Sequence, residues 1–153
     1  MFEAQQRVEV EWRDPRVEFF NLQPREFQNT LGEEEAAMVW VPSLTLINTG
    51  QQETSKRDNS SLVTVARRGR MRRSGLEESK NIYIYSGREN WLRMSRVHST
   101  KWLCSFQMAW YPFDTQVCTL EFAPSGNLAN YLQLEVGRHA YSGDKELTQY
   151  FIR

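Results

Sequence analysis

This sequence of 153 residues lacks several features that would point to common classes of function. It has only two cysteines and two histidines, and no C-x-x-C pair, so the spacing predicts no metal site. No apolar run reaches the roughly 20 residues of a membrane-spanning helix, and no signal peptide is visible at the N-terminus. Paired-carboxylate and G-x-S-x-G motifs are also missing, so we expect neither an enzyme nor a cofactor.

An excess of charge of one sign is missing as well, since 19 Lys and Arg residues balance 19 Asp and Glu residues. This balance gives no overall attraction to nucleic acid or to an anionic membrane. The local exception is 67–73, with five arginines in seven residues. It indicates either a phosphate or nucleic-acid patch or a solvated hairpin tip. We favour the tip and predict no nucleic-acid partner, because Glu77 and Glu78 follow and no aromatic residues alternate with the arginines.

The sequence contains a series of short runs in which apolar and polar residues alternate. Val8, Val10 and Trp12 alternate with glutamates, which is typical of a half-buried strand. Similar patterns predict strands at 7–12, 16–20, 38–41, 44–48, 62–66, 81–85, 91–97, 102–108, 115–122, 131–136 and 147–152. Only 32–38 has a helical pattern. Many short strands in a chain that is 40% hydrophobic predict an all-β sandwich.

The segment from Cys104 to Cys118 differs from the rest of the chain. The two cysteines are either two buried thiols or one bridge, which would contribute about 3 kcal/mol and imply an oxidising compartment. Between them, 110–113 is Trp-Tyr-Pro-Phe, an apolar tip at a place where a surface hairpin is ordinarily polar. Such a tip either folds against its own core or docks onto another apolar body.

These residues resemble the signature of the Cys-loop superfamily, the pentameric ligand-gated ion channels. The shared features are two cysteines separated by thirteen residues and an aromatic-Pro-x-Asp core. Trp12-Arg-Asp-Pro-Arg-Val17 is similar to the family's W-x-D segment, and Trp40-Val-Pro42 to its W-x-P segment. The resemblance extends from about Arg7 to the end of the chain. The residues at 110–116, Trp-Tyr-Pro-Phe-Asp-Thr-Gln, are most similar to those of invertebrate, anion-channel-like members.

The resemblance implies a twisted, Ig-like β-sandwich of about ten short strands. This would be the extracellular ligand-binding domain of a plasma-membrane channel subunit that assembles into a homo- or hetero-pentamer. A small-molecule ligand would bind between neighbouring subunits. Trp12 and Trp40 would fill the core rather than contact the ligand.

The resemblance also implies that Cys104 and Cys118 form a disulfide-bridged loop that presses on the membrane domain and helps to open the pore. Tyr111, Pro112 and Phe113 would then dock toward the membrane helices. Asp114 would take part in the charged contacts there.

The aromatic cage that holds amine ligands in relatives is not matched. The corresponding positions are Ile47 and Ser125, neither of which is aromatic. On the complementary face the positions are Arg7 and Glu9, with Arg93 on the facing strand. A guanidinium binds carboxylates well, so the two arginines would suit an anionic or zwitterionic ligand. The alternative, which we favour, is that they are ordinary surface arginines.

Compared with complete members of the family, residues 1–153 are expected to be a partial domain. A signal peptide, the first strand, the last strand and the membrane helices would lie outside it. If the natural chain ends near Arg153, the alternative is a secreted ligand-binding protein of the acetylcholine-binding-protein type or a non-conducting truncated subunit. Asn59 begins an N-x-S sequon and is a glycosylation candidate.

Overall fold

A computed structural model describes residues 1–50, 53–55, 61–73, 82–111 and 113–143. Within these ranges there are nine strands: β1 (Phe2–Trp12), β2 (Glu18–Phe20), β3 (Leu44–Leu46), β4 (Glu53–Ser55), β5 (Leu62–Ala66), β6 (Met71–Arg73), β7 (Tyr83–Ser86), β8 (Trp91–Trp102) and β9 (Phe122–Pro124). Helical segments are short: α1 (Glu33–Met38) and the 3₁₀ turns η1 (Glu26–Asn29), η2 (Met108–Trp110) and η3 (Gly126–Asn130). The predicted all-β sandwich is confirmed. No helix in the described ranges has the length and apolarity to cross a membrane.

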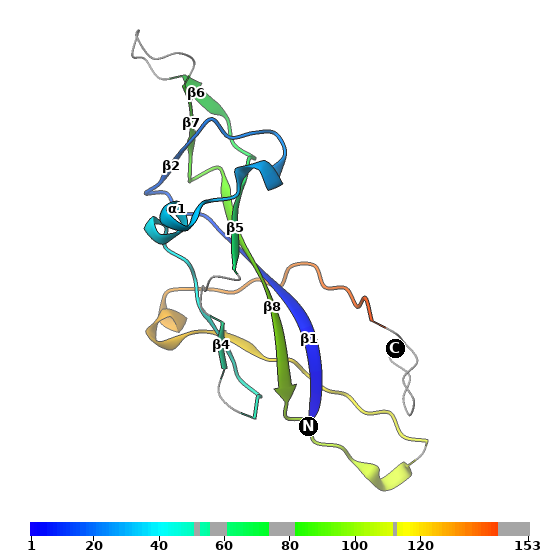
Figure 1. Cartoon of the computed structure of the whole chain (residues 1–153). Coiled ribbons are helices and arrows are strands. Elements are labelled where there is room, and N and C mark those ends of the chain that lie inside the picture. The colour runs from blue at the N-terminus through cyan, green and yellow to red at the C-terminus, as the bar shows by residue number, and fades with distance from the viewer. Residues whose placement is uncertain (51–52, 56–60, 74–81, 112, 144–153) are drawn as a thin grey trace.

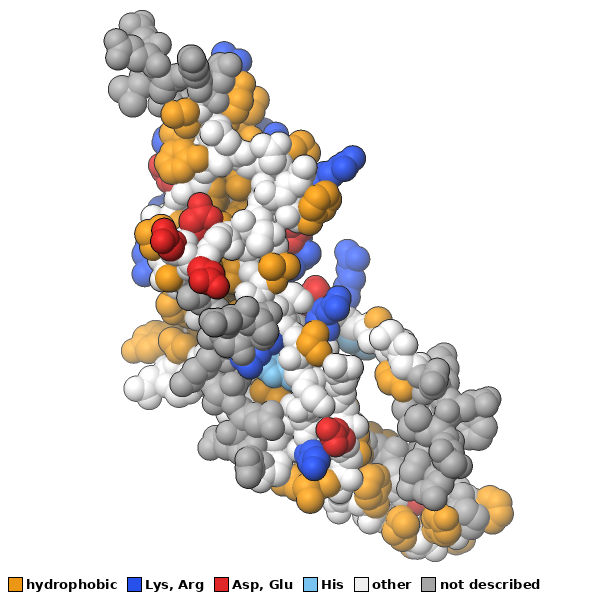
Figure 2. All heavy atoms as spheres, in the orientation of Figure 1, with side chains coloured by type: hydrophobic (Ala, Val, Ile, Leu, Met, Phe, Trp, Pro, Cys, Tyr) orange, Lys and Arg blue, Asp and Glu red, His pale blue; other side chains and the backbone are white. Residues whose placement is uncertain are grey.

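The strands form three antiparallel sheets of three strands each among the described residues. Their orders are β1-β8-β5, β2-β7-β6 and β4-β3-β9. The longest pairing joins β1 to β8 along the whole of β1, from Phe2 opposite Trp102 to Trp12 opposite Leu92. This long ribbon separates an upper end with β2, β6 and β7 from a lower end with η2 (Figure 1). Hydrophobic side chains are exposed at the lower end (Figure 2).

The core lies at the upper half of the β1-β8 ribbon. Leu92 and Met94 of β8 are fully buried there, and Val65 of β5 is buried beside them because β5 pairs with the same stretch of β8. Trp12 belongs to this core, and the half-buried Trp40 packs against it. The buried members of the cluster are Trp12, Phe19, Leu22, Ala36, Val63, Val65, Tyr85, Leu92 and Met94.

Several strand predictions are wrong in the second half of the chain. Residues 103–108, 115–121 and 131–136 are not in strands, although their apolar residues alternate. A strand forms only where a neighbouring backbone accepts and donates its hydrogen bonds. Alternation of apolar and polar residues shows only that one face of the segment favours burial. Within 103–143, the segment Phe122–Pro124 finds such a partner, in β3. The prediction for 38–41 is also wrong, because 38 ends α1. The predicted strand 147–152 lies outside the described residues.

A tight corner follows β1 and is built around Asp14. The carboxylate of Asp14 is buried and accepts hydrogen bonds from Arg16 Nε at 2.8 Å, Arg16 Nη2 at 2.7 Å and the Arg16 backbone N–H at 3.1 Å. The backbone of this corner lies against Gly87, where a Cβ would come within 2.1 Å of the Asp14 carbonyl oxygen. Only glycine fits at this close approach. The Asp of the W-x-D segment therefore fixes the corner where the chain leaves the long ribbon.

The Asp14–Arg16 pair predicts a pH-dependent contribution to stability. The hydrogen bond from Arg16 holds the pKa of Asp14 below its ordinary 3.8, although burial opposes this effect. A carboxyl with a lowered native pKa stabilises the fold above its unfolded pKa, and this contribution disappears as the pH falls through the native pKa. We therefore expect Arg16→Ala to lower the urea midpoint at pH 6. The difference from the parent protein should shrink as the pH falls below 3.8.

The control for this prediction is Arg25→Ala, which removes another exposed arginine. It should change the urea midpoint by the same small amount at every pH. A difference between Arg16→Ala and the parent protein that stayed constant from pH 6 to pH 2.5 would contradict the linkage.

Candidate functional site

The first part of the candidate site is the loop between Cys104 and Cys118. A disulfide joins the two cysteines, with 5.7 Å between their Cα atoms. Of the two arrangements left open by the residues alone, the bridge is therefore the one that forms. The loop leaves the end of β8 at Trp102 and returns toward β9, so both of its ends are anchored on sheets.

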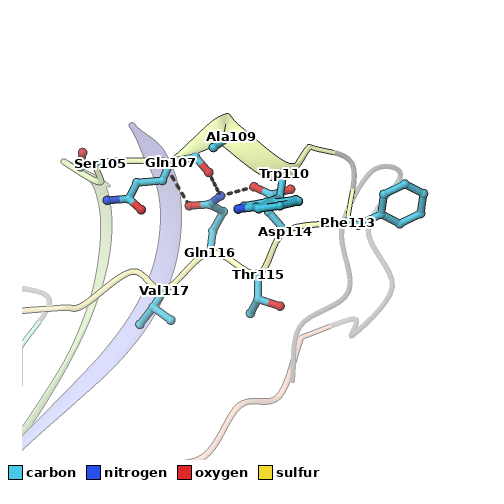
Figure 3. Close-up of a pocket in the computed structure, with 9 residues that line it drawn as sticks. All are labelled: Ser105, Gln107, Ala109, Trp110, Phe113, Asp114, Thr115, Gln116 and Val117. Atoms are coloured by element: carbon cyan, nitrogen blue, oxygen red, sulfur yellow. Dashed lines mark hydrogen bonds between the residues drawn. The ribbon is translucent and has the colours of Figure 1, made fainter.

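Gln116 connects the two sides of the loop a few residues beyond the disulfide (Figure 3). Its side-chain Nε2 donates to the Gln107 carbonyl at 2.8 Å, and its Oε1 accepts from the Gln107 N–H at 3.1 Å. The same Nε2 also donates to the carboxylate of Asp114. One side chain thus satisfies both backbone groups of the opposite side and holds Asp114 in place. Gln116 could not be predicted from the sequence, because a lone glutamine has no recognisable signature.

The tip of the loop is apolar and exposed. Trp110 is 79% exposed, Tyr111 67% and Phe113 93%, while Asp114 beside them is half-buried. Residues on both sides of the loop line a shallow hollow of about 540 Å³. Figure 3 shows the ring of Phe113 directed away from the other lining residues. Pro112 lies outside the described residues.

The candidates Ile47 and Ser125 lie at opposite ends of the β3-β9 ladder. The Ile47 N–H donates to the Glu121 carbonyl at 2.9 Å, and the Ser125 N–H donates to the Ser43 carbonyl at 3.0 Å. The Ile47 side chain is exposed, and the Ser125 hydroxyl is 3.0 Å from the Thr45 hydroxyl. The structure therefore brings both positions onto one sheet, separated by the length of the ladder.

The candidates Arg7, Glu9 and Arg93 share one face of the β1-β8 ribbon. Arg7 lies opposite Val97, Glu9 opposite Ser95 and Arg93 opposite Glu11 in the register of the two strands. Directly opposed residues of an antiparallel pair point to the same side, and so do alternate residues along a strand. Arg7 and Glu9 are exposed, and Arg93 is partly buried.

Arg93 is already paired with acidic side chains. Its Nε donates to Glu11 at 2.8 Å, its Nη2 contacts the same carboxylate, and its Nη1 lies 2.8 Å from Glu26. The hydrogen bond with Glu11 is the main cause that raises the pKa of Arg93, with smaller contributions from Glu26 and Glu9. Arg7 forms no ion pair with any residue in the described part of the chain. Glu26 could not be predicted from the strand pattern, because it lies in η1, outside the ribbon.

No group of His, Cys, Asp and Glu in the described ranges has an arrangement that could hold a metal ion. The glycosylation candidate Asn59 lies outside those ranges. The described part of the molecule places the candidate residues at the β3-β9 ladder, on the β1-β8 ribbon and in the disulfide-bridged loop.

Comparison with known families agrees with this arrangement. Residues 1–152 match the family model of the neurotransmitter-gated ion-channel ligand-binding domain. The match covers nearly the whole chain, so the chain belongs to this family. No curated protein and no solved structure matches the chain. The family is a channel domain and not a class of enzyme.

Proposed function

We propose that this chain is the extracellular ligand-binding domain of a pentameric ligand-gated channel subunit in the plasma membrane. A small-molecule ligand binds between neighbouring subunits of a homo- or hetero-pentamer. The Cys104–Cys118 loop transmits binding to the pore. The family match supports the ligand-binding role, and the exposed apolar tip of the loop is the observation that carries the coupling role.

The separation of the candidate residues supports a site between subunits. Ile47 and Ser125 flank the β3-β9 ladder, whereas Arg7, Glu9 and Arg93 lie on the β1-β8 ribbon, which belongs to a different sheet. One ligand can contact both sets of residues if one subunit supplies the residues of the β3-β9 ladder and its neighbour supplies those of the β1-β8 ribbon. Closed rings use this kind of head-to-tail interface.

The charges on the ribbon indicate which arginine would meet a ligand. An anion at Arg93 would have to compete with Glu11 and Glu26 for the guanidinium. Arg7 is exposed and pairs with no described carboxylate, so it is the better candidate for the carboxylate of an anionic or zwitterionic ligand. Glu9 is one alternate position away on the same face and would suit the amino group of a zwitterion.

The exposed tip favours a channel subunit over a soluble binder. Leaving Trp110, Tyr111 and Phe113 in water is unfavourable unless another apolar body covers them. The membrane domain of the complete subunit is that body in our proposal, and Asp114, held by Gln116, takes part in the charged contacts. The alternative is a secreted ligand-binding protein or a non-conducting truncated subunit, which would need no such partner.

The test joins this domain to the membrane domain of a related channel and screens the chimeric channel against amine and amino-acid transmitters. The measured quantity is the current that an agonist evokes. We expect Phe113→Ala to raise the half-maximal agonist concentration about tenfold, because a coupling energy of 1–3 kcal/mol is typical between communicating sites. Ligand binding to the unattached domain should not change.

The matched control is Tyr131→Ala, which removes an aromatic ring of 84% exposure outside the loop. It should leave the current and surface expression unchanged. Equal effects of the two variants would contradict the coupling role. Ligand binding by a secreted pentamer, combined with currents that do not respond to Phe113→Ala, would favour the soluble alternative.

A further inference from the structure

The proposed function makes no use of the arginine-rich segment 67–73, which the structure places at the upper end of the molecule. Six exposed arginines lie there, five in the turns that follow β1, β5 and β7 and one on β6. We call this the arginine surface: Arg13, Arg67, Arg68, Arg70, Arg73 and Arg88. Arg72 does not belong to it, because alternate residues of β6 point to opposite faces of the sheet and Arg72 lies opposite Ile84. The arginine surface is farthest from the loop tip along the β1-β8 ribbon (Figure 1).

A buried amide holds two turns of this surface together. Asn90 is fully buried, and its Oδ1 accepts from the Arg68 N–H at 3.0 Å and the Gly69 N–H at 2.9 Å. Its Nδ2 donates to the Ser86 carbonyl at 2.8 Å. The turn after β5 is therefore fixed against the turn before β8. The arginines on these turns occupy a defined surface rather than a loose tip.

Aromatic rings from other strands lie under the arginines. Arg67 stacks over Tyr85 at 5.1 Å, and Arg13 and Arg68 stack over Trp91 at 4.8 and 5.6 Å. These rings are not evident from the residues of 67–73, because β7 and β8 contribute them. Stacking of this kind orients a guanidinium while its donors stay available at the surface.

Most of these charges have no acidic partner among the residues that the structure describes. Arg68 lies 3.6 Å from Glu11. The other five form no ion pair with any carboxylate in the described ranges; they are Arg13, Arg67, Arg70, Arg73 and Arg88. Acidic side chains gather over α1, below this end of the molecule (Figure 2). The carboxylate of Glu89 also lies here and accepts from the Arg70 backbone N–H at 2.9 Å. The described residues at this end therefore carry more arginines than carboxylates.

A hollow beside the arginines is suited to a ring with polar substituents. It has a volume of about 470 Å³, and its lining includes Arg67, Met71, Tyr83 and Tyr85. Arg73 lies opposite Tyr83 in the β6-β7 register, so it is on the same face. Aromatic walls beside guanidinium groups can pack against a flat ring while binding an oxyanion attached to it.

We propose that the arginine surface binds a sulfated polysaccharide chain outside the cell. The six arginines extend beyond the hollow, which favours an extended polyanion over a small anion, because each charge that is neutralised releases counterions. The choice of a polysaccharide over nucleic acid rests on the extracellular location in the proposed function. The arginine surface lies at the end of the molecule opposite the loop tip, so in the proposed subunit it faces away from the membrane.

The test measures binding of the 153-residue chain to immobilised heparin, with fully desulfated heparin and a single-stranded oligonucleotide as competitors. We expect Arg70→Ala combined with Arg73→Ala to weaken heparin binding about tenfold and to reduce the slope of log Kd against log salt by about 2. Both side chains are exposed and unpaired in the described ranges, so the urea midpoint should not move.

The control of equal charge is Lys101→Ala combined with Arg138→Ala, two exposed residues outside the arginine surface. It should leave heparin binding unchanged. Equal weakening in both double variants, or competition by desulfated heparin as strong as by heparin, would overturn the proposal. Preference for the oligonucleotide would assign the surface to nucleic acid instead. The heparin assay involves no agonist and no current. Heparin binding can therefore be absent while the proposed channel function holds, and it can be present while the channel function fails.

Discussion

Replacing Trp102 by alanine is expected to destabilise the domain by about 3–5 kcal/mol, the range typical of removing a large buried aromatic side chain. Trp102 is the last residue of β8 and is fully buried. Its ring meets the edge of Phe122 with 5.6 Å between centroids, and its Nε1 donates to Gln6 at 3.2 Å. It thus joins the β1-β8 ribbon to the β4-β3-β9 sheet. Domains of this size are stable by only about 5–15 kcal/mol, so the loss is a large fraction of the total.

The matched control is Trp110→Ala, the same substitution at a side chain of 79% exposure. It should change the stability by less than about 0.5 kcal/mol. Urea unfolding followed by far-ultraviolet circular dichroism is the suitable measurement, because tryptophan fluorescence would change with the substitutions themselves. Trp102→Phe should fall between the two and remains informative if the alanine variant does not fold. Equal midpoints for Trp102→Ala and Trp110→Ala would show that Trp102 does not hold the two sheets together.

Replacing both cysteines by serine is expected to cost about 3 kcal/mol, because the bridge closes a loop of about 15 residues and restricts the unfolded chain. The native loop is exposed along most of its length and gains little from core packing. Within it, Gln116 provides a second closure through Gln107. We therefore expect the fold to survive at lower stability, with the loop less well fixed.

The measurement compares urea midpoints with and without dithiothreitol. The reductant should lower the midpoint of the parent protein to that of the Cys104→Ser/Cys118→Ser variant and leave the variant itself unchanged. A free-thiol count of zero in denatured, unreduced protein is the accompanying expectation. Two free thiols in that assay, or a variant as stable as the oxidised parent, would be incompatible with the bridge.

The pattern of the sequence was sufficient for the strands whose partners lie close to the core. The alternation in 62–66 matches β5, and 7–12 and 91–97 fall within the longer β1 and β8. At the core, Val10 and Val63 lie opposite Met94, and Trp12 and Val65 lie opposite Leu92. The same alternation at 131–136 predicted a strand that does not form, because local pattern carries no information about whether a partner backbone is near.

The five tryptophans of the chain show the same limit. Alternation with glutamates was enough to assign Trp12 to a buried face, and Trp102 and Trp110 carry no comparable signal. Their exposures are 0% and 79%, although only seven residues separate them. Trp102 ends a paired strand, whereas Trp110 lies at the tip of a loop. Burial was decided by the position of other segments, above all β9.

The sequence by itself determined the all-β class and the resemblance to the family, and through that resemblance it implied the bridge between the two cysteines. These follow from side-chain periodicity and from a motif whose residues are contiguous. The tertiary structure alone decided that Gln116 braces the loop, that Glu11 and Glu26 occupy Arg93, and that Tyr85 and Trp91 lie beneath the arginines. Each of these contacts, apart from those within the loop, joins residues that are far apart along the chain. Their proximity is set by strand pairing and burial, which no local pattern contains.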